Sequence, residues 1–337
     1  MSPRETLRVL GWLVRDTFRQ SIDSRVFWMM LGVSAVVIAT CASVGVVGGA
    51  PLYKTGDYAD FLPRNDRDAA PKKMARDGVE TPSGELTLAF GALRMPVARD
   101  GPDAVRFIET VLSATLANTV GLLLALVWTA GFLPAFLAPA SAAVLLSRPV
   151  SRRVLFLGKC LGVYAFVGFQ TAVLVLGTWT ALGARTGVWD PTYLLSLPLL
   201  MLQFVVFFSV SALAAARLRG TVACVLASLM FWFLCWGMNY GRHATVALPR
   251  TAPGLATAAR PLGSVVELGY WLLPKPADLG MIQADSMNTG RHLMSVPEFE
   301  EVKRLDRFHP VASVVTSLLA AAALLALAVR EFEDVDY

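Results

Sequence analysis

The chain has 337 residues, of which 55% are hydrophobic and only 16% are charged, and its formal net charge is +5. Soluble domains are closer to one quarter charged, so this composition argues against a single large soluble core. The basic residues form no Lys/Arg-rich run, which argues against a nucleic-acid-binding protein.

The first 25 residues carry charges throughout and lack the pattern of a signal peptide. Their apolar residues recur at steps of three and four, which places them on one face of a helix. These residues are Leu7, Leu10, Val14, Phe18 and Ile22. Arginines and aspartates fall elsewhere around the same helix. We therefore predict that residues 1–25 form a cytoplasmic amphipathic helix, a membrane elbow at the bilayer interface.

Six segments are long and apolar enough to cross a bilayer, since a spanning helix needs about 20 apolar residues. They are approximately residues 26–49, 105–133, 154–183, 193–216, 221–240 and 311–329. The sequence therefore predicts an all-α membrane protein whose transmembrane domain covers residues 26–337. Residues 51–104 and 241–310 are predicted to form outer loops.

Basic residues in the short connections indicate the orientation, because Lys and Arg near the ends of spans resist translocation. The second and third spans are joined by a segment holding Arg148, Arg152 and Arg153, and the fourth and fifth by one holding Arg217 and Arg219. Arginines of the first 25 residues fall on the same side. We therefore predict a multi-pass protein of the plasma (inner) membrane with both termini cytoplasmic.

The two outer segments differ in composition. The first is rich in Pro, Gly and Asp, which favours a partly ordered loop, with a compact capping element as the alternative. The second contains SVVELGYWLLPKPADLG, predicted to be a short surface helix with Tyr270 and Trp271 at headgroup level. Pro274 and Pro276 are expected to end this helix.

Polar and reactive residues give few signs of catalysis. The sequence has no GxxxxGK[ST] phosphate-binding loop, no HExxH and no GxSxG, so we expect no enzyme activity and no bound cofactor or metal. Four cysteines lie among apolar residues and are expected to be buried: Cys41, Cys160, Cys224 and Cys235. Glu109 is expected at the outer mouth of the second span, because an ionised group deeper in the membrane is costly.

The remaining polar residues of the spans favour hydrogen bonding between helices, with the lining of a translocation path as the alternative. They are Ser113, Thr115, Asn118, Thr119, Gln170, Thr171, Gln203, Ser209, Ser211 and Asn239. Gly158 and Gly162 would allow another helix to approach closely.

The most informative segment is LLSRPVSRRVLFLGK, residues 145–159, between the second and third spans. Residues 134–150 are too polar at their end for lipid and too apolar for a free loop. They suit a short helix at the cytoplasmic face, stopped by Pro149, with the arginines exposed. The alternative is that these arginines serve only to fix the membrane topology.

This pattern resembles the basic turn of the permease subunits of ABC type-2 transporters, with the closest similarity to the multi-copper enzyme maturation permease group. The residues that carry the resemblance are Leu145, Leu146, Ser147, Arg148, Pro149, Val150, Ser151, Arg152, Gly158 and Lys159. The segment Leu272 to Gly280 and the closing Phe332, Asp336 and Tyr337 are weaker similarities. The uncharged residues 136–144 and the acidic end of the chain depart from the family pattern.

The resemblance implies that the turn is a coupling helix that seats in a groove of a separate ABC ATPase subunit, which binds ATP and Mg. The coupling residues it implies are Ser147, Arg148, Pro149, Ser151, Arg152, Arg153 and Lys159. It also implies a dimer with a second copy of this or a similar permease, and an exporter whose substrate choice comes from spans 2 and 5 and the outer loops. The alternatives are a non-transporting membrane scaffold that binds a partner through its extracytoplasmic loops and a membrane enzyme. The enzyme is disfavoured because the spans lack clustered ionisable residues.

Overall fold

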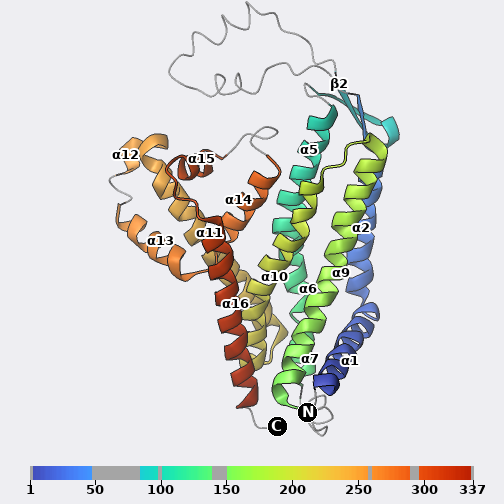
Figure 1. Cartoon of the computed structure of the whole chain (residues 1–337), viewed down its shortest axis with the longest axis vertical. Helices are drawn as coiled ribbons and strands as arrows, with labels where there is room; N and C mark the ends of the chain where they lie inside the picture. Colours follow the sequence, from blue (N-terminus) through green and yellow to red (C-terminus); the bar gives the residue numbers. More distant parts are fainter. Residues whose placement is uncertain are drawn as a thin grey trace, which may run out of the picture.

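Six long helices form the bundle seen in a computed structural model of the chain (Figure 1). The structure describes residues 3–47, 84–97, 101–138, 150–256, 260–288 and 296–334. The helices long and apolar enough to span a membrane are Arg25–Ala42, Gly101–Phe136, Arg152–Thr186, Pro191–Leu218, Thr221–Arg250 and Pro310–Glu333. The predicted all-α membrane protein with six spans is confirmed.

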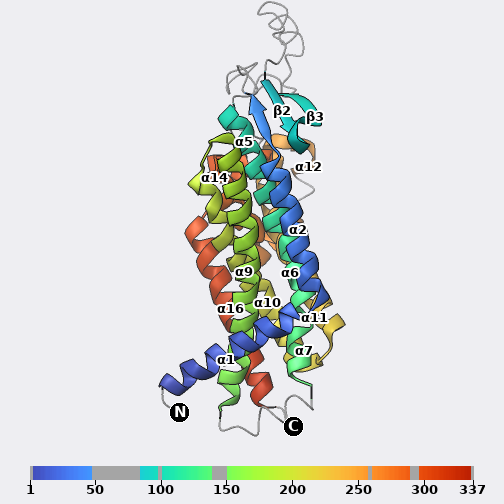
Figure 2. The same cartoon turned by 90° about the vertical axis from the view of Figure 1, so that its right-hand side faces the viewer.

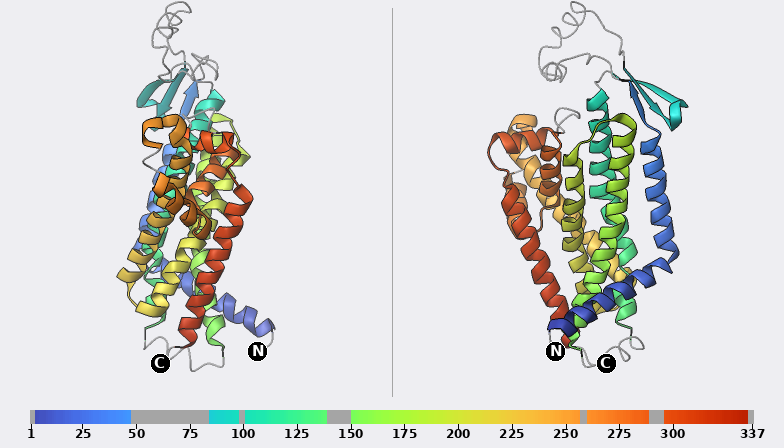
Figure 3. Two further views of the ribbon diagram at one scale, coloured as in Figure 1. Left: turned by 90° about the vertical axis from the view of Figure 1, so that its left-hand side faces the viewer. Right: turned by 45° about the vertical axis from the view of Figure 1, so that its right-hand side comes forward.

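The N-terminal helix α1 (Pro3–Ile22) lies obliquely across the end of the bundle where α16 (Pro310–Glu333) also finishes (Figures 2 and 3). We call this the terminal end. A short break separates α1 from α2 (Arg25–Ala42), and Ser24 caps α2 by accepting a hydrogen bond from the Val26 N–H at 3.2 Å. A serine in this position is a common start of a helix, because its hydroxyl pairs an otherwise free backbone N–H.

A three-stranded antiparallel sheet lies at the opposite end of the bundle, which we call the sheet end (Figure 1). Its strands are β1 (Gly45–Val47), β2 (Gly84–Leu88) and β3 (Leu93–Val97), and β2 pairs with both neighbours. The predicted first span to residue 49 is therefore too long, since α2 ends at Ala42 and the chain turns into β1.

The second span changes its winding along its length. It consists of α5 (Gly101–Val111), a π-helix η2 (Leu112–Gly121), α6 (Leu122–Thr129) and α7 (Phe132–Phe136). A π-helix of 10 residues is unusual, because i→i+5 winding occurs mostly as single turns, often at functional sites.

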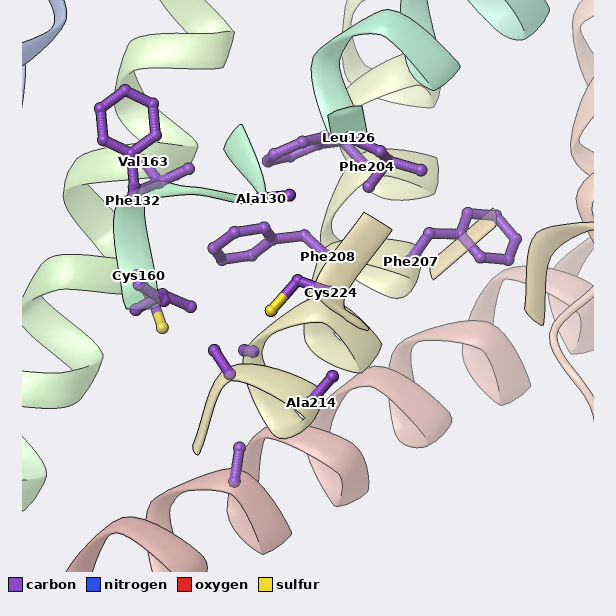
Figure 4. Packing of buried hydrophobic residues seen from close by; sticks show 14 of the residues in the cluster. Leu126, Ala130, Phe132, Cys160, Val163, Phe204, Phe207, Phe208, Ala214 and Cys224 are labelled. Atoms are coloured by element: carbon purple, nitrogen blue, oxygen red, sulfur yellow. The ribbon is translucent and has the colours of Figure 1, made fainter. Parts of the chain in front are cut away.

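The third span is α9 (Arg152–Thr186). The fourth span consists of the 3-10 helix η3 (Pro191–Leu195) followed by α10 (Ser196–Leu218). Of the six spans, the fourth is the most deeply buried. Around it gather the side chains of the main core, including Leu126, Val163, Phe204 and Phe208 (Figure 4). All four cysteines are buried and free, as predicted.

The fifth span is longer than predicted, because α11 runs from Thr221 to Thr251 rather than ending near Tyr240. In the described parts of residues 252–309, four shorter helices follow it before α16. They are α12 (Pro253–Ala256), α13 (Arg260–Leu272), α14 (Pro276–Ser286) and α15 (Pro297–Arg304). The predicted short helix ends at Leu272, before Pro274 and Pro276, as expected. Pro276 also begins α14, since proline suits the first turn, where its missing N–H is not needed.

Candidate functional site

Helix α1 is held against α9 by two glycines. The buried residues of α1 that face α9 include Leu13 and Thr17. A Cβ at Gly158 would lie 2.4 Å from the Leu13 Cδ1 atom, and one at Gly162 would lie 2.5 Å from the Thr17 Oγ1 atom. Both distances are too short for non-bonded atoms, so only glycine lets α1 approach α9 this closely.

The apolar face predicted for α1 is only partly covered by the protein. Leu7 and Ile22 are 69% and 44% exposed, whereas Leu10, Val14 and Phe18 are half-buried. Phe18 packs edge to face on Phe166 of α9, with ring centroids 5.3 Å apart. The five residues therefore divide between contact with the bundle and the molecular surface.

Lys159 lies beneath α1 and is 2% exposed. Its Nζ atom donates a hydrogen bond to the Gln20 Oε1 atom at 2.8 Å and lies 3.5 Å from the Asp16 Oδ2 atom. The same ammonium lies 5.8 Å from the centre of the Phe136 ring. Lys159 therefore joins α1, α9 and α7 inside the protein, unlike the exposed Arg153 of the basic turn.

The basic turn reaches the end of the last helix. Ser147, Arg148 and Pro149 lie outside the described residues, and Ser151 takes the N-cap position of α9. The guanidinium of Arg152 donates to the Glu333 carbonyl oxygen at 2.9 Å. That of Arg153 donates to the Glu333 carboxylate at 2.6 Å.

The acidic end of the chain thus has local partners. Besides the Glu333 contacts, the Glu331 carboxylate lies 3.9 Å from the Arg217 guanidinium of α10. Glu331 and Glu333 therefore place negative charge beside two basic connections at the terminal end.

A fully buried carboxylate joins four helices near the sheet end. The Asp278 Oδ1 atom of α14 accepts from the Asn239 amide at 2.8 Å and lies 2.7 Å from the His243 Nε2 atom. Its Oδ2 atom accepts from the Tyr270 hydroxyl at 2.9 Å and from the Ser313 hydroxyl at 2.5 Å. These residues come from α11, α13 and α16, so Asp278 holds α14 inside the bundle.

Basic residues surround this cluster. The Arg242 guanidinium lies 3.1 Å from the Glu267 carboxylate and 4.0 Å from the centre of the Tyr270 ring. The buried Lys275 donates from Nζ to the Thr316 hydroxyl at 2.8 Å. Because buried charges need partners, these contacts allow a charged cluster to exist within an apolar bundle.

The surroundings shift the pKa values of the cluster. Burial acts to raise the pKa of Asp278, but the hydrogen bonds from His243, Ser313 and Asn239 together outweigh it and hold the pKa below its ordinary value. Burial, followed by the charge of Asp278, raises the pKa of Tyr270 to about 12. At neutral pH, Asp278 is therefore a carboxylate and Tyr270 is a neutral donor to it.

Sequence reasoning missed this cluster because it ended the fifth span at Tyr240. The prediction that Tyr270 lies at headgroup level was wrong: its side chain is buried, whereas Trp271 is exposed. A signal was available, since Asn239 and His243 are four residues apart and share a helix face. Recognising it requires that α11 continue past Tyr240.

A cavity of about 650 Å³ lies between the second and fifth spans and the inserted helices α14 and α15. Figure 1 shows α14 between α11 on one side and α5 and α10 on the other. The lining of the cavity is mostly apolar. Amide and hydroxyl groups come from η2, α10 and α14, and charged groups come from α14 and α15. Concave, mainly apolar pockets of 300–1,000 Å³ with a few polar groups are typical ligand sites.

Amide and hydroxyl groups form a network along one wall of this cavity. The Gln283 amide donates to the Ser196 hydroxyl at 2.6 Å and to the Ser113 hydroxyl. The Asn118 amide donates to the Gln283 carbonyl oxygen and accepts from the Gln203 amide at 3.4 Å. Three polar residues predicted in the spans, Ser113, Asn118 and Gln203, therefore both bond between helices and line the cavity.

The sequence pattern of the ABC-2 family transporter proteins matches residues 12–337. The chain therefore belongs to this family and is a permease, a membrane component of ABC transporters. No curated protein matches the chain. The match covers nearly the whole sequence, from within α1 onward, so the basic turn and the cavity both fall inside it.

Proposed function

We propose that this chain is the permease subunit of an ATP-driven exporter and that it couples a separate ATPase to substrate translocation. The ATPase would bind ATP and Mg. A second permease, identical or similar, would complete the dimer in the plasma (inner) membrane, with the terminal end cytoplasmic. Within the family, the multi-copper enzyme maturation permeases are the proposed group.

The observation that carries this proposal is the contact between the basic turn and the last span. Arg152 and Arg153, at the start of α9, both bond to Glu333 at the end of α16, and Lys159, about two turns further on, bonds to α1. A displacement of the turn by an ATPase would therefore move three helices together. Rigid-body motion of this kind is a known way to convert closure of one subunit into opening of another.

The cavity between the second and fifth spans is proposed as the substrate site on this path. Its position supports the proposal, because it adjoins the π-helix and the helix α14 that the Asp278 cluster anchors. Displacement of spans at the terminal end would change the width of the cavity between them.

The test is capture of the ATPase encoded beside this permease, in detergent, by the wild type and by the double variant Arg148→Glu/Arg152→Glu. We expect the wild type to retain the ATPase and the variant to lose it while still inserting normally. Arg94→Glu is the matched control, because Arg94 is an exposed arginine at the sheet end. If the wild type captures no ATPase, or the double variant binds equally well, the coupling proposal fails and the scaffold hypothesis is favoured.

A further inference from the structure

One wall of the cavity is a ladder of aromatic rings on α11. Trp232, Trp236 and Tyr240 follow at intervals of four residues, so they share one helix face over about 12 Å. Neighbouring ring centres are 6.4 and 5.1 Å apart, and the ring planes are inclined by 18° and 3°. The three side chains therefore form a series of nearly parallel aromatic rings along this wall.

Two buried polar groups of the lining have no hydrogen-bond partner among the described residues. They are the Trp232 indole N–H and the Thr110 hydroxyl, on side chains that are 7% and 4% exposed. An indole N–H can only donate. Leaving such a group buried without a partner is unfavourable, so the cavity is prepared for a ligand that brings an acceptor.

Charge in the cavity is confined to Asp285, Glu300 and Lys303, which belong to α14 and α15. Lys303 forms an ion pair with Asp285. The lining from the second, fourth and fifth spans is neutral, and an unpaired ligand charge there would be costly at membrane depth.

We propose that this cavity binds an uncharged, planar aromatic molecule that carries a hydrogen-bond acceptor. The inference rests on the proposed function only in taking this cavity as the substrate site. The ring of the ligand would pack against the aromatic rings of the ladder, in the offset-stacked or edge-to-face geometry that aromatic groups favour. Its acceptor would pair with the Trp232 N–H, and the volume of about 650 Å³ suits a molecule of drug size.

The experiment measures binding of 7-methoxycoumarin to the permease alone in lipid nanodiscs, with empty nanodiscs to subtract partition into lipid. Two competitors test the chemistry. A fully saturated bicyclic lactone keeps the acceptor but has no aromatic face, and 7-methoxycoumarin-4-acetic acid adds a negative charge. We expect saturable binding of the coumarin and at least tenfold weaker competition by both other compounds.

Two pairs of variants locate the site. Trp232→Phe keeps the ring and removes the N–H, and should weaken binding about three- to tenfold. Trp28→Phe is its control, because Trp28 is exposed on α2 away from the cavity lining. Gly280→Leu should abolish binding, since its Cβ would enter open space in the cavity, whereas Gly237→Leu has equal room outside the lining and should have no effect.

Absence of saturable binding, or equal binding by the saturated lactone, would overturn the proposal. So would unchanged affinity in both Trp232→Phe and Gly280→Leu. Because the assay contains no ATPase, these outcomes are independent of the ATPase capture that tests the proposed function.

Discussion

The two ends of the helix bundle hold their polar residues in opposite ways. At the terminal end, Arg153 and Arg217 are about 70% exposed and face carboxylates that remain in contact with solvent. Near the sheet end, Asp278 and His243 are fully buried and 2.7 Å apart. Exposed ion pairs contribute little to stability, whereas removal of one member of a buried charged cluster leaves the other groups unpaired. The ion pairs at the terminal end can therefore separate and form again with other groups at a small cost in free energy. The buried cluster near the sheet end instead keeps α14 in place.

The largest expected effect is the loss of Asp278. We expect Asp278→Ala to lower the free energy of unfolding by about 3–5 kcal/mol, because four hydrogen-bonding side chains would lose their common acceptor inside the protein. Thermal unfolding in detergent would measure this. Asp285→Ala is the control, since the Asp285 side chain is half exposed and, among the described residues, forms an ion pair with Lys303 only. A similar decrease in the free energy of unfolding in the two variants would contradict the contrast between buried and exposed carboxylates.

Acid should reproduce part of this effect without a mutation. The pKa of Asp278 is held below its ordinary value of 3.8, so the carboxylate stabilises the folded protein above that pH. The stabilisation should be lost as the pH falls from about 4 through the lower pKa of the folded state. Unfolding midpoints of the wild type and Asp278→Asn, compared between pH 7 and 3, should converge on acidification. A constant difference would show that Asp278 does not titrate in this way.

The sequence was sufficient for features that depend on local composition. Apolar windows of about 20 residues predicted the six spans, and the periodicity of apolar residues predicted a helix in α1. The π-helix could not be predicted, because no local residue type requires that winding. The Asp278 cluster depends on residues up to 74 positions apart, from Asn239 to Ser313, that only the packing of α14 brings together.

The candidate coupling site was predictable only in part for the same reason. Four of its residues, Ser151, Arg152, Arg153 and Lys159, are described by the structure, and they divide between surface and interior. The position of Lys159 follows from the space that Gly158 leaves for α1, which is a tertiary effect. Arg152 and Arg153 could be recognised from their position at the start of a span. Their partner Glu333 could not, because it lies near the other end of the sequence.

A smaller effect is expected where α1 meets α9. Gly158→Leu would place a side chain where Leu13 lies, and overpacking of this kind typically costs about 1–3 kcal/mol. We expect α1 to detach before the bundle unfolds, which would let its backbone unwind and be cut by trypsin at the exposed Arg15 and Arg19. Faster cleavage in α1 with a nearly unchanged unfolding midpoint would be the result. Gly32→Leu is the matched control, because a Cβ there meets no atom within 4 Å. Equal protection of α1 in both variants would show that α9 adapts to the added side chain.

The smallest effect on stability is expected at the Arg153–Glu333 pair. Arg153→Ala and Glu333→Gln should each leave the unfolding midpoint almost unchanged, because the exposed pair is well solvated when it separates. Their effects on ATPase capture should differ, however. If Arg153 contacts the ATPase, Arg153→Ala should weaken capture, whereas Glu333→Gln should preserve or strengthen it by freeing the guanidinium. Equal weakening in the two variants would instead mean that the intact pair, and with it the link from the basic turn to α16, is what the ATPase recognises.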